Sequence, residues 1–108
     1  MNGLREHKGA TLRLEIPTGL PEEYRTGIRE IVGLHSSNPR KGHATTLLLD
    51  VCHEADKAGI VLLLLPRKFD EGMDDEKLRA FYAKFGFAEI QQEPVVLMAR
   101  QAQGPRFH

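Results

Sequence analysis

Apolar and polar residues alternate regularly in residues 10–16 (ATLRLEI), near the start of the chain. Leu12, Leu14 and Ile16 fall on one side of an extended backbone, and the residues between them are polar, which predicts a strand with one buried face. Residues 1–9 are mostly polar and show no such pattern, so we expect them to be frayed.

Residues 27–35 (GIREIVGLH) predict a second strand, because they are rich in Ile and Val. Strict alternation would place four side chains on one face, namely Ile28, Glu30, Val32 and Leu34. Gly33 interrupts the pattern, and a glycine inside a strand marks either a bulge or a point where a ligand approaches the backbone closely.

A long amphipathic helix follows and leads into a short apolar strand. Apolar residues from Ala44 to Ala58 recur with helical spacing, and Gly59 is a typical helix stop. Residues 60–65 (IVLLLL) are uniformly apolar, which predicts a strand covered on both faces and therefore central in a sheet. Residues 27–65 thus predict a βαβ unit.

The last third of the chain predicts a second helix and two more strands. The helix begins at Asp74 or Asp75 and stops at Gly86, and its apolar stripe consists of Leu78, Phe81, Tyr82 and Phe85. Strands are expected over residues 87–90 and 95–100.

Length and composition limit the class of protein. The 108 residues, 41% of them hydrophobic, suffice for one domain with one core, whose ends, residues 1–9 and 101–108, we expect to be flexible. No apolar run approaches the roughly 20 residues that cross a bilayer, and the polar N-terminus does not resemble a secretory signal. The single cysteine, Cys52, is typical of a reducing compartment, so a cytoplasmic location is expected.

The net charge of the chain indicates which kinds of partner to expect. Fifteen basic and fifteen acidic residues balance to a formal net charge of zero, so whole-molecule attraction to nucleic acid is not expected. The same balance gives little repulsion between copies, which is compatible with a homodimer. The five histidines are scattered rather than clustered at ligand spacing, and we predict no metal site.

Residues 38–44 (NPRKGHA) form a basic, glycine-containing turn directly before the long helix. Gly42 permits a sharp turn and close approach of a ligand, and the free N–H groups and the dipole of the following helix attract anions. Arg40 and Lys41 add two positive charges. These features predict a phosphate site, and the alternative is a surface turn whose basic pair is solvated.

Two motifs in this order resemble those of the Gcn5-related N-acetyltransferases (GNATs). Residues 41–44 (KGHA) match the second half of the family's Q/R-x-x-G-x-G/A pyrophosphate turn, and residues 78–87 (LRAFYAKFGF) match its F-Y-x-K-x-G-F helix end. The resemblance covers residues 27–100 and implies an α/β (α+β) fold. This fold has a mixed, mostly antiparallel twisted sheet, a central βαβ unit and two main helices, and here it is shortened at the N-terminus.

The resemblance also implies that acetyl-CoA is the acetyl donor. Tyr82 corresponds to the tyrosine that protonates the departing thiolate, and backbone N–H groups near Leu34 would polarise the thioester carbonyl. The chain departs from the motif at Pro39, which stands where the family has Gln or Arg and has no N–H to offer a phosphate. The positions implied to contact the cofactor are Leu34, His35, Arg40, Lys41, Gly42, His43, Ala44, Asp75 and Tyr82.

Glu30 and His35 are candidate bases for the acceptor amine. Glu30 lies on the same predicted strand as Gly33 between apolar neighbours, which favour the neutral form of a carboxylate. The alternative is a carboxylate paired with Arg13 or Arg29. His35 either acts as a base near neutral pH or is a solvated histidine at the end of its strand.

Two classes of function remain open. The first is an acetyl-CoA-dependent N-acetyltransferase that acts on a protein lysine or a small amine, with Tyr82 and Glu30 as catalytic residues. The second is a non-catalytic CoA-binding or protein-interaction module on the same fold. Pro39 favours the second class, and the intact motif around Tyr82 favours the first.

Overall fold

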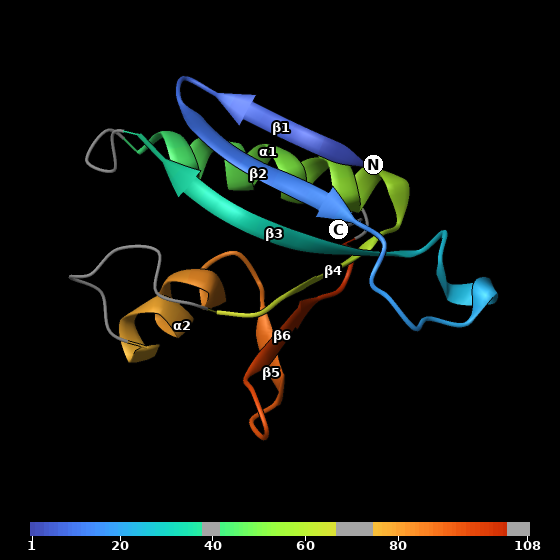
Figure 1. The fold of residues 1–108 in the computed structure, drawn as a ribbon. Coiled ribbons are helices and arrows are strands. Elements are labelled where there is room, and N and C mark those ends of the chain that lie inside the picture. The colour runs from blue at the N-terminus through green and yellow to red at the C-terminus, as the bar shows by residue number, and fades with distance from the viewer. Residues whose placement is uncertain (38–41, 67–74, 104–108) are drawn as a thin grey trace, which may run out of the picture.

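Strands outnumber helices in the computed structural model, which describes residues 1–37, 42–66 and 75–103. The strands are β1 (Gly3–His7), β2 (Ala10–Glu15), β3 (Ile28–Ser36), β4 (Val61–Leu64), β5 (Ala88–Gln91) and β6 (Leu97–Arg100). The helical segments are a 3-10 turn, η1 (Glu22–Tyr24), and the helices α1 (His43–Ala58) and α2 (Asp75–Ala83) (Figure 1). No helix within these ranges is long and apolar enough to span a membrane.

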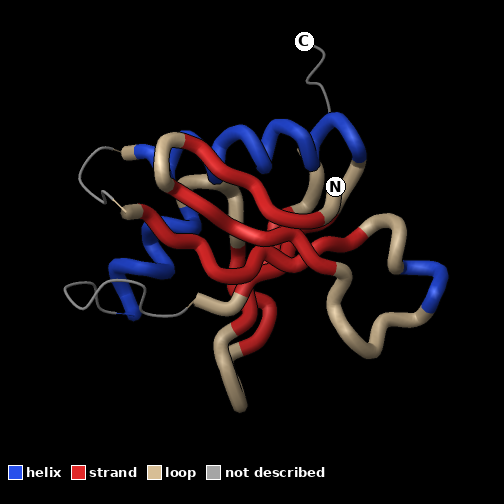
Figure 2. Tube along the Cα trace, turned by 45° about the horizontal axis from the view of Figure 1, so that its top comes forward, coloured by secondary structure: helices blue, strands red, loops and turns tan. Residues whose placement is uncertain are grey.

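The described strands form one twisted sheet in the order β1-β2-β3-β4-β6-β5 (Figure 2). β3 and β4 run parallel, and the other neighbouring pairs in this order are antiparallel. The mixed, mostly antiparallel sheet that the sequence predicts is therefore confirmed. The predicted βαβ unit is present as β3, α1 and β4, and its two strands lie in the middle of the sheet.

Helix α1 lies along one face of β1, β2 and β3 and covers the hydrophobic core (Figures 1 and 2). Its buried stripe has the helical spacing that the sequence predicts and consists of Leu47, Leu48, Val51, Cys52 and Ala55. These side chains belong to the same buried cluster as Ala10, Leu12 and Leu14 of β2. Each large apolar side chain removed from water in this way contributes about 1.5–3 kcal/mol. Gly59 ends the helix with φ of 71°, as predicted.

Strand β1 corrects the expectation that the first nine residues are frayed. A two-residue turn at Lys8 and Gly9, with φ of 49° and 88°, joins β1 to β2 as a tight hairpin. β1 buries little apolar surface, since Leu4 is 67% exposed, and Arg5 holds it to α1 by donating two hydrogen bonds to Glu54 (2.8 and 2.9 Å). A strand held by pairing rather than burial leaves no hydrophobic alternation in the sequence.

Two further expectations about burial are corrected. β4 is central in the sheet, as predicted, but only Leu62 and Leu64 of this strand are buried, whereas Val61 and Leu63 are half-buried. Ile16, expected on the buried face of the second segment, lies beyond the end of β2 and is 41% exposed. The core is on the α1 side of the sheet, so side chains on the other side keep contact with solvent.

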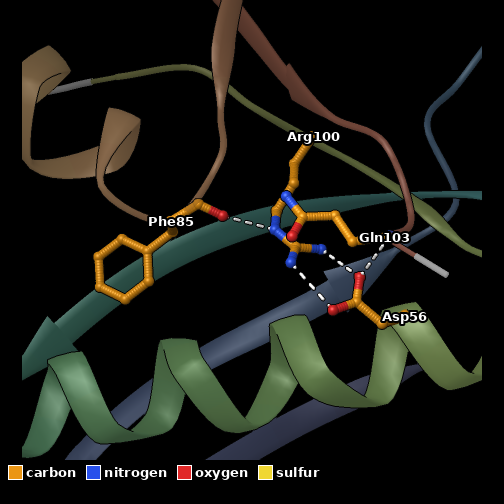
Figure 3. Close-up of polar contacts among 4 residues, drawn as sticks. All are labelled: Asp56, Phe85, Arg100 and Gln103. Carbon is orange, nitrogen blue, oxygen red and sulfur yellow. Dashed lines mark hydrogen bonds and ion pairs between the residues drawn. The ribbon is translucent and has the colours of Figure 1, made fainter. Parts of the chain in front are cut away.

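Arg100 of β6 places a positive charge inside this core, with only 4% of the residue exposed. Its guanidinium donates to both carboxylate oxygens of Asp56 on α1 (2.7 and 3.1 Å) and to the carbonyl oxygen of Phe85 (2.6 Å) (Figure 3). The backbone N–H of Gln103 also donates to Asp56 (2.8 Å). The start of the tail is therefore tied to α1, against the expectation of a flexible segment, and residues 104–108 lie outside the described residues.

Asp56→Ala should lower the free energy of unfolding by about 3 kcal/mol, because it leaves the buried Arg100 guanidinium without its carboxylate. Glu54→Ala is the matched control. Glu54 lies on the same helix and also binds an arginine, Arg5, but these side chains are 41% and 33% exposed, so we expect a loss of at most about 1 kcal/mol. Urea denaturation followed by circular dichroism measures both variants, and equal losses would contradict the prediction.

The ion pair of Asp56 and Arg100 also predicts that stability depends on pH. The hydrogen bond from Arg100 holds the pKa of Asp56 below its ordinary value of 3.8. The resulting stabilisation is therefore present above the unfolded pKa and is lost as the pH falls through the folded pKa. Thermal unfolding across this acid range should show a steeper loss for the wild type than for Asp56→Asn, and parallel profiles would disprove the linkage.

Candidate functional site

The parallel strands β3 and β4 part after three residue pairs. Their register runs from Ile28 opposite Val61 to Glu30 opposite Leu63, whereas β3 continues to Ser36. In Figure 1 the two strands leave this point in different directions, β3 towards the start of α1 and β4 towards α2. Residues 31–36 therefore pair with β2 along one edge, and no described strand pairs with residues 31–35 on the other edge. We call this edge the fork.

A bulge lies in β3 at the fork. Val32 pairs with Arg13 and His35 with Thr11, so three steps along β3 match two steps along β2. Gly33 lies within the extra step with φ of 66°, a conformation that glycine adopts without strain. Of the two alternatives for Gly33, the bulge is confirmed, and the close approach of a ligand stays a prediction.

The bulge corrects the expected position of Leu34. Strict alternation placed Leu34 on the face of Glu30 and Val32, but Leu34 is buried together with Ile31, while Glu30 and Val32 are half-buried. The extra residue shifts the alternation by one position, because each added residue turns the next side chain to the other face. The side chain of Leu34 therefore belongs to the core, and only its backbone lies at the fork.

The N-terminus of α1 has the properties of an anion site. Gly42 is the residue before the helix, with φ of 73°, and no side chain of the described residues caps the first turn. The first turn contains no acidic residue, and the carbonyl oxygen of Gly42 accepts from the Thr46 backbone N–H (3.1 Å) and hydroxyl (3.2 Å). His43 and Ala44 are half-buried there. Free N–H groups and the helix dipole at such an end attract anions.

The hairpin between β1 and β2 also reaches the start of α1. The ring of His7 lies edge-on to the ring of His43, with centroids 5.7 Å apart, and the Ser37 N–H donates to the Gly9 carbonyl (3.1 Å). Sequence reasoning missed His7, because the strand that carries it has no hydrophobic pattern. Arg40 and Lys41, predicted here as phosphate ligands, lie outside the described residues.

Tyr82 lies on the inner side of α2 with 1% of its surface exposed. Its ring makes edge contacts with Phe81 and Phe87, at centroid distances of 5.3 and 6.0 Å. No residue in the described ranges hydrogen-bonds to its hydroxyl. Burial raises the pKa of Tyr82 above its ordinary value, so the phenol stays protonated at physiological pH and is available as a donor. A catalytic role for Tyr82 stays a prediction.

Glu30 is half-buried on the last residue pair before the fork. Neither arginine considered as its partner binds it. Arg13 lies 3.5 Å from Glu15, and Arg29 donates to the Met1 carbonyl and the Asn2 side chain. Across the described part of the chain, Glu30 forms no salt bridge.

The remaining predicted site residues are less closely grouped. His35 is exposed at the end of β3, opposite Thr11. Asp75 is the first residue of α2. The described residues contain no group of three side chains able to hold a metal ion. Cys52 is buried in the core, and burial raises its pKa to about 11, so it is unsuited to nucleophilic chemistry.

Comparison with known proteins bears on the fold. No protein-family model and no curated protein matches the chain. Two solved structures are similar. The anti-CRISPR protein AcrVA5 has a TM-score of 0.66 and 20% identity, and the match covers 89% of this chain and 94% of that chain. An acyl-CoA N-acyltransferase from Pseudomonas aeruginosa has a TM-score of 0.57 and 19% identity, and the match covers 90% of this chain and 65% of that chain. This chain spans less than two thirds of the second protein. The likeness shows a GNAT-like fold, which confirms the fold implied by the two sequence motifs.

Gly33→Ala should destabilise the protein by about 1–2 kcal/mol, because an alanine at φ of 66° is strained. Gly27→Ala is the control. At both positions an added Cβ would meet nothing within 4 Å, but Gly27 has no positive φ, so we expect little change or a small gain. Chemical denaturation of both variants is the measurement. A stable Gly33→Ala protein would argue against the bulge.

Proposed function

We propose that this protein is an acetyl-CoA-dependent N-acetyltransferase. The observation that carries the proposal is the fork between β3 and β4, followed in the chain by the N-terminus of α1, which no described side chain caps. A free strand edge can bind an extended chain of amide groups, such as the pantetheine arm, and a helix N-terminus can bind phosphate. The similar fold of an acyl-CoA N-acyltransferase supports a substrate of this kind.

The first turn of α1 holds the phosphate end of the substrate. Gly42, His43 and Ala44 present backbone N–H groups, and the first turn has no carboxylate to repel a phosphate. Arg40 and Lys41, which immediately precede Gly42 in the sequence, add two charges to the same end of the site.

The fork holds the reactive end. Acetyl-CoA supplies an acetyl group that is activated as a thioester. N–H groups of residues 31–35 that lack a partner in a described strand bind the carbonyl oxygen and stabilise the negative charge that develops on it. We assign this role to the backbone near Leu34 and His35. Gly33 carries no side chain that would block the approach.

Tyr82 acts on the sulfur as a hydrogen-bond donor. A phenol ordinarily has a pKa near 10 and a thiol one near 8.5, so full transfer of the proton to a thiolate is unfavourable by about 2 kcal/mol even without burial. Burial raises the pKa of Tyr82 further and increases this difference. The tyrosine therefore stabilises the departing thiolate by donating a hydrogen bond, and complete proton transfer is unnecessary.

Glu30 acts as the base for the acceptor amine. It lies where β3 and β4 part and has no salt-bridge partner among the described residues, so its carboxylate is free to attract an ammonium group and accept its proton. Val32 on the same face is half-buried, and His35 is exposed. This open face suits a lysine on a protein as well as a small amine.

A second candidate is a CoA-binding or protein-interaction module without transferase activity. The enclosure of Tyr82 favours it, because a tyrosine that is 1% exposed among Phe81 and Phe87 is also explained by packing alone. This candidate differs from the enzyme in one measurable respect, which is turnover of the thioester.

Isothermal titration with acetyl-CoA, followed by a thiol-release assay with a lysine peptide and small primary amines, tests the proposal. The enzyme should bind acetyl-CoA and release thiol only when an acceptor is present. Binding without turnover for any acceptor would favour the module. No heat and no thermal shift at millimolar ligand would exclude the enzyme and a CoA-binding module, and would leave the protein-interaction module.

Tyr82→Phe should lower kcat about 100-fold and leave the dissociation constant for acetyl-CoA nearly unchanged, because the hydroxyl acts only as charge develops on the sulfur. Tyr24→Phe is the matched control, since Tyr24 is the other of the two tyrosines and is 52% exposed. We expect wild-type kinetics for Tyr24→Phe. An unchanged kcat in Tyr82→Phe would remove this residue from the chemistry.

A further inference from the structure

A series of hydrogen bonds runs from α1 through β6 to the backbone of Tyr82. Asp56 on α1 accepts two hydrogen bonds from Arg100, whose Nε donates to the Phe85 carbonyl oxygen (2.6 Å). The N–H of Phe85 in turn donates to the carbonyl oxygen of Tyr82 (3.0 Å). Figure 3 shows the guanidinium between the α1 carboxylate and the Phe85 carbonyl group. We call Asp56, Arg100 and Phe85 the arginine clamp.

The geometry of the clamp is specific to arginine. A planar guanidinium can donate a parallel pair of hydrogen bonds to a carboxylate and a further one in another direction, whereas a lysine ammonium acts as a point charge. Arg100 uses both capacities at once. Its burial keeps water from replacing either contact.

Gly86 leaves the space that the clamp needs. It follows Phe85 with φ of 96°, and a Cβ there would lie 2.8 Å from the Gln103 side-chain nitrogen and 3.4 Å from Nε of Arg100. A larger residue would therefore be strained and would press on the guanidinium. The glycine of the F-G-F segment thus lets Arg100 pack against the turn that ends α2.

The two helices joined by the clamp carry different parts of the proposed site. The N-terminus of α1 provides the phosphate end and α2 provides Tyr82, and the segment that leads into α2 lies outside the described residues. We propose that Arg100 is a positioning residue, which fixes the Tyr82 end of α2 relative to α1 and so sets the hydroxyl at the thioester. This inference rests on the proposed function, and it adds a residue that neither sequence motif contains.

A double-mutant cycle with Arg100→Lys and Tyr82→Phe tests whether Arg100 acts through the tyrosine. Arg100→Lys keeps the charge but cannot make all three hydrogen bonds. We expect kcat to fall about 10- to 100-fold, with the acetyl-CoA dissociation constant and KM nearly unchanged. In the Tyr82→Phe background the same change should alter kcat by less than about twofold, since the hydroxyl that it positions is gone.

Arg5→Lys is the matched control for the cycle. Arg5 also donates two hydrogen bonds to a carboxylate of α1, that of Glu54, but it has no contact with the α2 turn. We expect this variant to keep wild-type kcat. An equal loss of kcat from Arg100→Lys in both tyrosine backgrounds would show a general structural effect and would overturn the inference.

Ultraviolet titration of tyrosinate tests the position of Tyr82 without any activity. In the wild type, buried Tyr82 should ionise only on alkaline unfolding. Arg100→Lys and the milder Asp56→Asn should make this ionisation occur at lower pH, and Arg5→Lys should not. If Tyr82 ionises alike in all variants, Arg100 does not hold it, and the inference is wrong even where transfer is confirmed. If the wild type neither binds nor turns over acetyl-CoA, the proposed function fails, and the spectra then report whether Arg100 keeps Tyr82 buried.

Discussion

The short parallel pairing of β3 and β4 is the constraint on which the rest of this structure depends. Three residue pairs suffice to join the two halves of the sheet, and beyond them β3 follows β2 alone. The bulge at Gly33 belongs to the same feature, because an extra residue increases local twist and turns the end of β3 away from β4. A free backbone edge inside an otherwise paired sheet is costly unless water or a ligand binds it.

Helix α1 stabilises the sheet where β3 and β4 part. It crosses from the end of β3 to the start of β4, and its buried stripe packs on β1, β2 and β3, so the sheet keeps a core on one face even where the strands part. The same helix begins next to the fork, at a turn that no described side chain caps. Structural support and anion affinity therefore come from different groups of one element, the apolar side chains along its buried face and the N–H groups of its first turn.

The buried charge pair of Arg100 and Asp56 links the two halves of the molecule. A buried salt bridge is weak evidence for stability, because the cost of desolvation offsets the attraction. This salt bridge instead fixes the geometry. The guanidinium binds both Asp56 on α1 and the main chain after α2, and so specifies how the two helices lie. Gly86 is part of this specification, because a Cβ at that position would lie 2.8 Å from the Gln103 side-chain nitrogen and 3.4 Å from Nε of Arg100.

The sequence by itself determined the elements whose residues repeat with a clear period. These are β2, α1 with its stop at Gly59 and the order of elements around the βαβ unit, because local burial imposes periods of two and 3.6 on the chain. Only the tertiary structure decided the rest. β1 is held by pairing and one salt bridge, Leu34 changes face because of a single extra residue, and Arg100 meets a carboxylate 44 positions earlier in the chain. Such contacts depend on which segments the fold brings together, and the local pattern of apolar and polar residues does not predict them.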